Sequence, residues 1–194
     1  MMKPIEFQLN ALKVFLSGQE VDYAILGGIA VFLFGEPRLT MDVDVNIMLS
    51  KRDIGKFLKN GRPYGFLPAT PETPEIGKKT GIIPVKFARG RVRGRFDFIL
   101  AENVLENNAI ARAKAKKIGS VAVKVITPED LVIHKITSER PRDLEDIPGV
   151  LMRQSGKLDL RYIRKWLKTI DTANTGAGLL KKFNRLLKKS EGRD

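Results

Sequence analysis

Apolar residues recur at helical or strand spacing along the first part of the chain, and glycines separate the runs. The spacing predicts a helix over 5–17 and a short strand over 21–26, which ends at Gly27-Gly28. The apolar segment 29–34 follows directly and stops at a Gly-x-Pro sequence. We interpret this segment as a short buried helix, because the glycine pair opens it and the Gly-x-Pro sequence closes it.

Polar and apolar side chains then alternate over 41–49, which predicts a β-strand. Side chains two residues apart in a strand point to the same face. We therefore expect Asp42 and Asp44 to project together while Val43 and Val45 face the core. The next sequence, Ser-Lys-Arg-Asp at 50–53, resembles a capping box at the start of a helix.

The middle of the chain is predicted to contain one long loop and three strands. The segment 63–79 is rich in Pro, Gly and Thr, which favours a loop. Strands are expected over 82–87, 92–100 and 121–126. The first two are predicted to form a hairpin around Arg89-Gly90-Arg91.

Helix signals dominate the remainder. Thr127 is a good N-cap and Pro128 suits the first helical position, so a helix should run from there to about Glu139. Pro141 opens a further helix, and 158–189 should form two helices separated near 174–176. We predict an α+β fold, with a mixed sheet and flanking helices over 1–126 and a helical C-terminal region over 127–194.

Composition narrows the class of protein. Hydrophobic residues make up 43% of the 194, enough for a buried core. No apolar run approaches a membrane span and no signal peptide is visible, so we expect no membrane partner and a cytoplasmic location. The absence of cysteine excludes disulfides, zinc fingers and thiol catalysis. A net charge of +13 and a sequence pI of about 10.0 favour a polyanionic partner, in first place nucleic acid.

The candidate chemistry lies around the two aspartates. Paired carboxylates on one strand face repel each other, and metal binding or ion pairing would offset the repulsion; carboxylate oxygens suit Mg²⁺. Gly27 and Gly28 allow close approach of a ligand, and helix-start N–H groups can hold phosphate. Asp97, flanked by apolar residues on another strand, could be a third metal ligand or a general base. The alternative is an edge-strand aspartate that pairs with Arg93 or Arg95.

These motifs resemble the nucleotidyltransferase superfamily of the DNA polymerase beta type, whose hallmark is Gly-Gly or Gly-Ser, a short helix, and hydrophobic-Asp-hydrophobic-Asp. More closely, the chain is similar to the AbiEii/AbiGii-type nucleotidyltransferases, which include toxins of toxin–antitoxin pairs. The matching segments span about residues 23–147. They are Gly27-Gly28, Arg38-x-Thr40-x-Asp42-x-Asp44, Asp97 in its strand, Thr127-Pro128-Glu129-Asp130-Leu131-x-x-x-Lys135 and Arg140-x-Arg142-Asp143-x-x-Asp146-Ile147.

The resemblance implies a nucleotidyltransferase-like sheet and transfer of a nucleoside monophosphate from a nucleoside triphosphate (NTP), dependent on Mg²⁺ or Mn²⁺. It further implies RNA, notably the 3′ end of tRNA, as acceptor, and an antitoxin protein as a candidate partner. The metal and catalytic residues would be Asp42, Asp44 and Asp97, joined by Lys135 in catalysis. The nucleotide-binding residues would be Gly27, Gly28, Arg38, Thr40 and Lys135.

Alternatives remain for several of these residues. Arg38 could bind phosphate or hold a carboxylate, or be an ordinary surface residue. Lys135 could be a solvated helix lysine. Asp143 and Asp146 share a helix face and could support Lys135 or the site. They could instead pair with arginines at the helix surface.

Basic residues cluster twice. The segment 78–95 has seven basic residues and no acid and leads into Asp97, and eleven basic residues against four acids follow from Lys157 onward. We expect Arg89, Arg91 and Arg93 to bind the RNA backbone, with solvated faces as the alternative.

Two other functions are considered. A protein or small-molecule acceptor, such as an aminoglycoside, would keep the chemistry, but the basic charge disfavours it. A non-catalytic RNA-binding module on the same fold is disfavoured because the glycine pair and both aspartates are intact.

Overall fold

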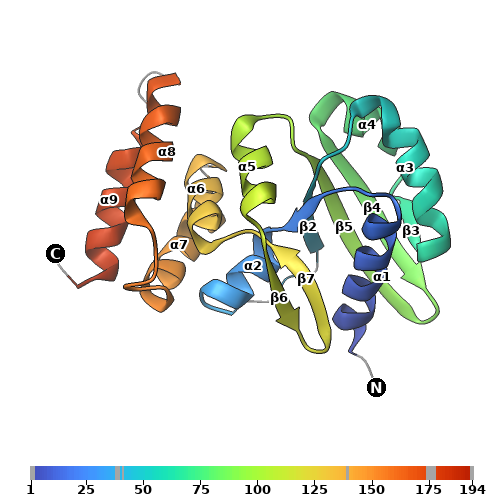
Figure 1. The fold of residues 1–194 in the computed structure, drawn as a ribbon, viewed down its shortest axis with the longest axis horizontal. Coiled ribbons are helices and arrows are strands. Elements are labelled where there is room, and N and C mark those ends of the chain that lie inside the picture. The colour runs from blue at the N-terminus through green and yellow to red at the C-terminus, as the bar shows by residue number, and fades with distance from the viewer. Residues whose placement is uncertain (1–2, 38–39, 41, 139, 174–177, 193–194) are drawn as a thin grey trace. The chain divides into compact units, whose positions relative to one another are not determined.

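The computed structural model describes residues 3–37, 40, 42–138, 140–173 and 178–192 (Figure 1). The chain forms two compact units, of which the first comprises residues 1–28 and 40–126 and the second residues 29–39 and 127–194. The boundary expected after residue 126 coincides with a change of unit, whereas 29–39 groups with the second unit. A division into functional domains stays a prediction. No helix in the described ranges is long and apolar enough to cross a membrane.

The first unit is a seven-stranded sheet in the order β3-β4-β5-β2-β1-β7-β6, with helices packed against it. Its helices are α1 (Pro4–Gly18), α3 (Ile54–Gly61), α4 (Thr73–Thr80) and α5 (Val104–Arg112). Its strands are β1 (Tyr23–Ile25), β2 (Asp42–Ile47), β3 (Phe66–Pro68), β4 (Ile82–Arg89), β5 (Val92–Leu100), β6 (Lys114–Ile118) and β7 (Val121–Val125). The predicted mixed sheet with flanking helices is confirmed.

The strand β2 occupies the middle of this sheet. It pairs antiparallel with β1 and parallel with β5, and β5 pairs antiparallel with β4. The hairpin predicted around Gly90 is confirmed, because Arg89 pairs with Val92 across a two-residue turn. A central strand has both side-chain faces available for packing or chemistry, and β2 uses them differently.

One face of the sheet carries an aromatic core. Phe66 of β3 lies 5.1 Å from Phe96, and Phe57 of α3 lies 5.1 Å from Phe98, both measured between ring centroids. Phe15 of α1 stacks at 5.3 Å on Phe66. Because these rings are almost fully buried, α1, α3 and the sheet are held by apolar packing that also orients β2 and β5.

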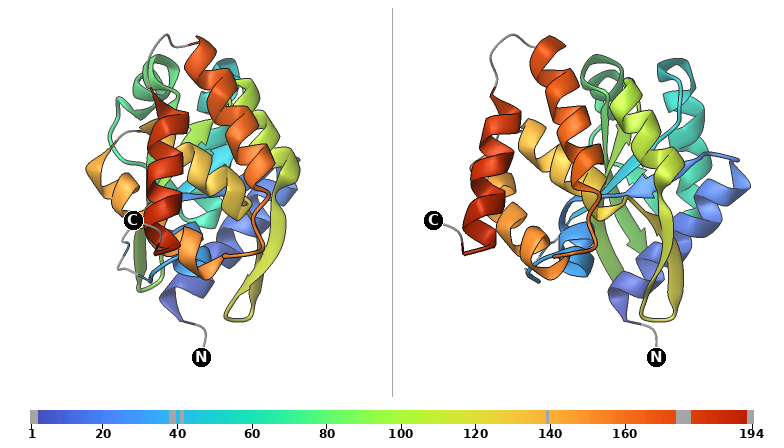
Figure 2. Two further views of the ribbon diagram at one scale, coloured as in Figure 1. Left: turned by 90° about the vertical axis from the view of Figure 1, so that its left-hand side faces the viewer. Right: turned by 60° about the vertical axis from the view of Figure 1, so that its left-hand side comes forward.

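The second unit is helical. Its helices are α6 (Pro128–Ser138), α7 (Pro141–Arg153), α8 (Leu160–Ala173) and α9 (Leu179–Ser190), and most of α2 (Gly27–Phe34) also belongs to it. Contacts of α6 with α7 and α8, and of α9 with α7 and α8, make α6 to α9 a bundle, which Figure 2 shows from two sides. The predicted break between the last two helices, at 174–176, lies outside the described residues.

Polar contacts at the start of α6 explain how this bundle is joined. Thr127 Oγ1 accepts a hydrogen bond from the backbone N–H of Asp130 at 3.2 Å, so the predicted N-cap is confirmed. The fully buried Asp130 accepts a 2.6 Å hydrogen bond from the Tyr162 hydroxyl on α8. Glu129 accepts a hydrogen bond from the Asp159 N–H just before α8. Glu129 and Asp130 therefore connect α6 to α8 through hydrogen bonds.

Two local predictions are wrong. The segment 63–79 is not one loop, because it contains β3 and most of α4. Pro74 at the start of α4 and the left-handed Gly81 after it are ordinary signals of a helix start and a helix end. The prediction gave more weight to the Pro, Gly and Thr content of the segment than to these signals. Ser50 makes no side-chain capping hydrogen bond, and a short 3-10 helix, Lys51–Asp53, precedes α3 instead.

Candidate active site

The face of β2 opposite the aromatic core carries two carboxylates. Asp42 and Asp44 are half-buried there, whereas Val43 and Val45 are buried in the core, as the alternation predicted. Because Val43 and Val45 are buried on the core face of β2, the two aspartates project from its opposite face.

A third carboxylate joins this face from β5. In the parallel pairing of the two strands, Asp97 lies directly opposite Asp44, and Arg95 lies opposite Asp42. The strand β5 lies between β4 and β2, so the interpretation of Asp97 as an edge-strand residue is wrong. We call the face that carries Asp42, Asp44 and Asp97 the carboxylate face.

Burial and charge both act on Asp97. Burial raises the pKa of its carboxyl group above the ordinary value of 3.8, and the nearby negative charge of Asp42 raises it further, while Arg95 lowers it. A raised pKa brings a carboxylate closer to the range in which it accepts protons at neutral pH. Asp97 therefore has an environment that suits a base or a cation ligand.

The contact between Asp42 and Arg95 is loose. Arg95 Nε lies 3.4 Å from Asp42 Oδ1, within ion-pair distance. Asp42 Oδ1 is nevertheless buried and has no hydrogen bond to the described residues, so the two groups meet without hydrogen-bond geometry. We regard this as a weak Coulombic contact that leaves a buried carboxylate oxygen in need of a partner.

The glycine pair at the start of α2 is shaped around the carboxylate strand. Gly27 has a φ of +60°, and a Cβ atom there would collide with the carboxylate of Asp44. A Cβ on Gly28 would collide with Thr40, whose hydroxyl donates to the Asp42 carbonyl oxygen at 3.0 Å. The two glycines thus let the backbone at the start of α2 approach β2 closely. Arg38, the other residue predicted to bind the nucleotide here, lies outside the described residues.

We expect Gly27→Ala to destabilise the first unit by about 1–3 kcal/mol, because the left-handed backbone is strained and the new methyl group displaces Asp44. Gly90→Ala is the matched control: Gly90 has a φ of +57°, but a methyl group there would meet open space among the described residues. Urea unfolding of both variants separates backbone strain from the collision. Equal losses of stability would show that Asp44 does not rest against Gly27.

The carboxylate face fits a divalent cation in residue type, but its described side chains do not form a ready-made metal site. Among the described residues, no three His, Cys, Asp or Glu side chains converge on one metal position. The carboxylate of Asp44 rests against Gly27, and that of Asp42 lies near Arg95. Three oxygen donors on one face, one with an unsatisfied buried oxygen, nevertheless match the ligands that Mg²⁺ and Mn²⁺ prefer.

A large cavity of the first unit does not contain this chemistry. Its volume is about 920 Å³. Most of the residues that line it are apolar and several are prolines, and they come from α3, β3 and the following loop, together with Lys59 and Arg62. None of the described residues that line it is a carboxylate. We place the candidate site by its side-chain chemistry rather than by cavity size.

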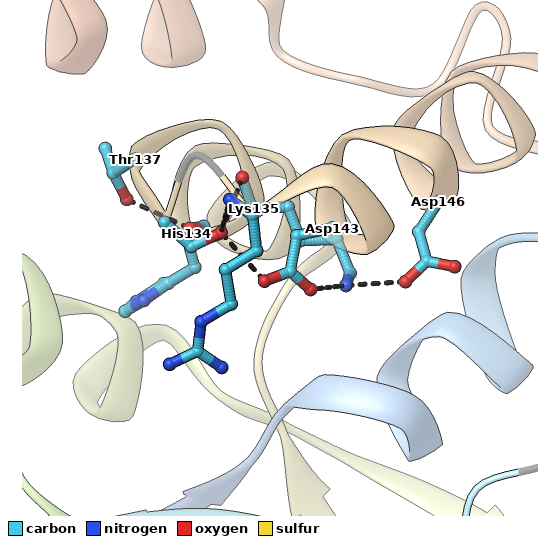
Figure 3. A network of polar contacts seen from close by, with 7 residues as sticks. His134, Lys135, Thr137, Asp143 and Asp146 are labelled. Atoms are coloured by element: carbon cyan, nitrogen blue, oxygen red, sulfur yellow. Dashed lines mark hydrogen bonds and ion pairs between the residues drawn. The ribbon is translucent and has the colours of Figure 1, made fainter.

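In the second unit, Lys135 joins two carboxylates of α7. Its Nζ lies 2.7 Å from Asp143 Oδ1 and 2.7 Å from Asp146 Oδ2 (Figure 3), and only 4% of its side chain is exposed. Ser138 donates a further hydrogen bond to Asp143. Of the alternatives for Asp143 and Asp146, the contact with Lys135 is present, and it makes Lys135 a buried link between α6 and α7. The alternative of a solvated Lys135 is wrong. Its contact with a triphosphate stays a prediction.

The pKa of Asp143 gives a pH test of this link. Burial alone would raise it, but hydrogen bonds from Lys135 and Ser138 and the Lys135 charge hold it below the ordinary 3.8. A lowered folded-state pKa stabilises the fold above pH 3.8, and that stabilisation is lost as the pH falls through the folded-state value. We expect the difference in unfolding free energy between wild type and Asp143→Asn to shrink below pH 3.8. A pH-independent difference in urea titrations would contradict it.

The three arginines predicted to bind RNA do not share one surface. Arg89 lies on the helix-covered face, with its guanidinium 5.8 Å from the centre of the Phe7 ring. Arg93 lies on the carboxylate face, and its guanidinium donates to the carbonyls of Gly90 and Val92. Arg91 is exposed in the turn. Strand alternation separates these side chains although they follow one another in the sequence.

The sequence alone did not indicate a role in the site for two residues of the carboxylate face. Arg95 was considered only as a partner of Asp97, yet it contacts Asp42 across the sheet. Asn46, two residues after Asp44, is 1% exposed, and neither of its side-chain polar atoms has a hydrogen bond to the described residues. The strand alternation over 41–49 already places Asn46 beside Asp44, and the two-residue spacing from Asp97 is the signal that places Arg95 on this face.

Comparison with known proteins agrees with this architecture. Residues 95–183, slightly less than half of the chain, match a family model described as nucleotidyl transferase of unknown function (DUF2204). An antigenic nucleotidyltransferase-like protein from Paracoccidioides brasiliensis is similar over 91% of this chain and 93% of its own, with 21% identity and a TM-score of 0.52. The antibiotic-resistance factor ANT(2″)-Ia is similar over 89% of this chain and 96% of its own, with 11% identity and a TM-score of 0.55.

No curated protein matches the chain. At the identities of the two structural matches, the likeness establishes the fold. The family-model match adds support for a nucleotidyltransferase enzyme with a nucleotide substrate, and the expected closeness to the AbiEii/AbiGii type stays a prediction. By its fold the chain is similar to nucleotidyltransferase-like proteins, and by its residues 95–183 it is similar to a nucleotidyl transferase family.

Proposed function

We propose that the chain transfers a nucleoside monophosphate from an NTP to an acceptor in a reaction that needs Mg²⁺ or Mn²⁺. The observation that carries the proposal is the alignment of Asp42, Asp44 and Asp97 on one face of two paired strands. The glycine pair at the start of α2 lies directly against Asp44. This arrangement places the three carboxylates beside a glycine pair whose backbone a ligand can approach closely.

In the proposed reaction, an acceptor oxygen forms a bond to the α-phosphorus while the bond to the leaving pyrophosphate breaks. Asp42 and Asp44 would hold the divalent cation, which neutralises phosphate charge when bound, and Asp97 would serve either as a third ligand or as the general base. The acceptor proton passes to a base, for which Asp97 is the candidate because burial and Asp42 raise its pKa. Lys135 is proposed to contact the triphosphate, on the resemblance stated above.

RNA is the proposed acceptor, with the 3′ end of tRNA as the specific candidate. The net charge of +13 supports a polyanionic acceptor, because a positive field raises the local concentration of such a molecule. A role as the toxin of a toxin–antitoxin pair, with an antitoxin partner, rests on the AbiEii/AbiGii resemblance.

A small molecule or a protein hydroxyl is the second candidate acceptor. One structural match is described as an antibiotic-resistance factor, which makes a small antibiotic a reasonable compound to test. A cationic or neutral acceptor would gain nothing from the basic charge of this chain.

The test is transfer of label from each α-labelled NTP, offered separately with Mg²⁺, onto total RNA, with Asp42→Asn in parallel. Labelled RNA that is absent with the variant would support the proposal and name the nucleotide. Label on a protein or an antibiotic in place of RNA would move the proposal to the second acceptor class. No label on any acceptor, with RNA binding intact, would leave a non-catalytic RNA-binding module.

A further inference from the structure

Cationic side chains share the carboxylate face in register with the aspartates. Lys86 of β4 lies opposite Arg95 of β5, which in turn lies opposite Asp42 of β2. The next row along the sheet contains Asp97 and Asp44. Adjacent strands are about 4.8 Å apart, and residues two apart on a strand about 6.6 Å, so both rows lie within reach of one phosphate-bearing molecule.

These cations differ in how firmly they are held. The guanidinium of Arg93 is held at the hairpin turn by hydrogen bonds of 2.7 and 2.9 Å. Lys86 is exposed and makes no hydrogen bond or ion pair with the described residues. Arg95 is 71% exposed, and its only ion pair within the described ranges is the loose 3.4 Å contact with Asp42. Lys86 and Arg95 are therefore available to a ligand.

Charge explains why Arg95 lies near Asp42 in the protein alone. Three carboxylates on one face repel one another, and the Arg95 guanidinium offsets part of this repulsion. A divalent cation bound to the same carboxylates would compete with Arg95 for Asp42, because both are positive charges that seek the same oxygens. Once released from Asp42, Arg95 would lie beside Lys86.

We propose that Arg95 and Lys86 form a phosphate-binding pair beside the carboxylates, and that Asp42 holds Arg95 until a divalent cation replaces it. This rests on the proposed function and specifies how the same site exchanges its positive charges. The ligand chemistry is a phosphate group, which belongs either to the triphosphate of the nucleotide or to the backbone of an RNA acceptor. Arginine and lysine are the side chains that bind such groups.

The first measurement is the affinity of the nucleotide-free protein for Mn²⁺ by isothermal titration calorimetry at fixed ionic strength. We expect Arg95→Gln to bind Mn²⁺ about two- to fivefold more tightly than wild type, because a weak competing ion pair is removed. Lys117→Gln is the matched control, since it removes one exposed positive charge from β6 at the far edge of the sheet. Equal Mn²⁺ affinities in the two variants would overturn the exchange.

The second measurement is binding of two probes in the presence of Mn²⁺, inorganic tripolyphosphate and a short oligouridylate. We expect Arg95→Gln and Lys86→Gln each to lower the binding affinity for one of the two probes by roughly tenfold, the scale of a lost charged hydrogen bond. A loss confined to tripolyphosphate assigns the pair to the nucleotide, and a loss confined to oligouridylate assigns it to the acceptor. Losses no larger than that of Lys117→Gln would overturn the phosphate-binding pair.

These outcomes are separable from failure of the proposed function. If wild type bound no Mn²⁺, both the metal-dependent reaction and the exchange at Asp42 would be rejected. If wild type bound Mn²⁺ and transferred nucleotide while Arg95→Gln behaved as Lys117→Gln, only the present inference would be rejected.

Discussion

Asp42→Asn is expected to lower the rate of nucleotidyl transfer by roughly 10²–10³-fold, the scale lost when one group that stabilises transition-state charge is removed. The amide has the size of the carboxylate but carries no negative charge with which to hold a divalent cation. Asp44→Asn should act in the same way, because both residues project from one face of β2. The measurement is the initial rate of label transfer from the preferred α-labelled NTP at saturating Mg²⁺.

This loss should occur without loss of stability. Removing one of three neighbouring carboxylates lowers their mutual repulsion, so the thermal midpoint of Asp42→Asn should not fall. Asp53→Asn is the matched control, since Asp53 follows β2 on the 3-10 helix and pairs loosely with Arg52. Full activity of Asp42→Asn, or the same loss in Asp53→Asn, would remove the carboxylate face from the mechanism.

Lys135→Met is expected to lower the unfolding free energy by about 3–5 kcal/mol, because a buried carboxylate and a partly buried one would lose the Lys135 ammonium group. Lys135 is 4% exposed and Asp146 8%, so water cannot replace the lost contact easily. Lys124→Met is the control: Lys124 and Asp22 form a similarly short pair, at 2.9 Å, but are about half exposed. That loss should stay below about 1 kcal/mol. Urea unfolding at neutral pH measures both.

A second variant separates structure from nucleotide binding. Adding Asp143→Asn and Asp146→Asn to Lys135→Met removes the two carboxylate charges that Lys135 neutralises and should restore most of the lost stability. If Lys135→Met left stability unchanged but raised KM for the NTP, Lys135 would be a nucleotide ligand with no structural role. If stability fell and the triple variant recovered it without recovering activity, Lys135 would serve both purposes.

Local patterns predicted the elements that contribute the candidate site. The spacing of Asp42 and Asp44 on a strand was predictable because side-chain alternation is a property of the backbone alone. The same holds for the Thr127 cap of α6, which depends on neighbours within one turn. The segment 63–79 was misjudged because β3 has only three residues and forms through pairing with β4, which composition does not reveal.

By itself, the sequence determined that this protein has a strand with two carboxylates on one face and a glycine pair before it. Only the tertiary structure decided that Asp97 lies opposite Asp44 and Arg95 opposite Asp42, because the register of β5 against β2 depends on burial of their apolar side chains, such as Val43 beside Phe96, on the other face. It also decided that Lys135 meets Asp143 and Asp146, since that contact requires α6 to pack against α7. Periodicity acts between neighbours in the chain, whereas register and helix packing arise from burial of surfaces that are distant in sequence.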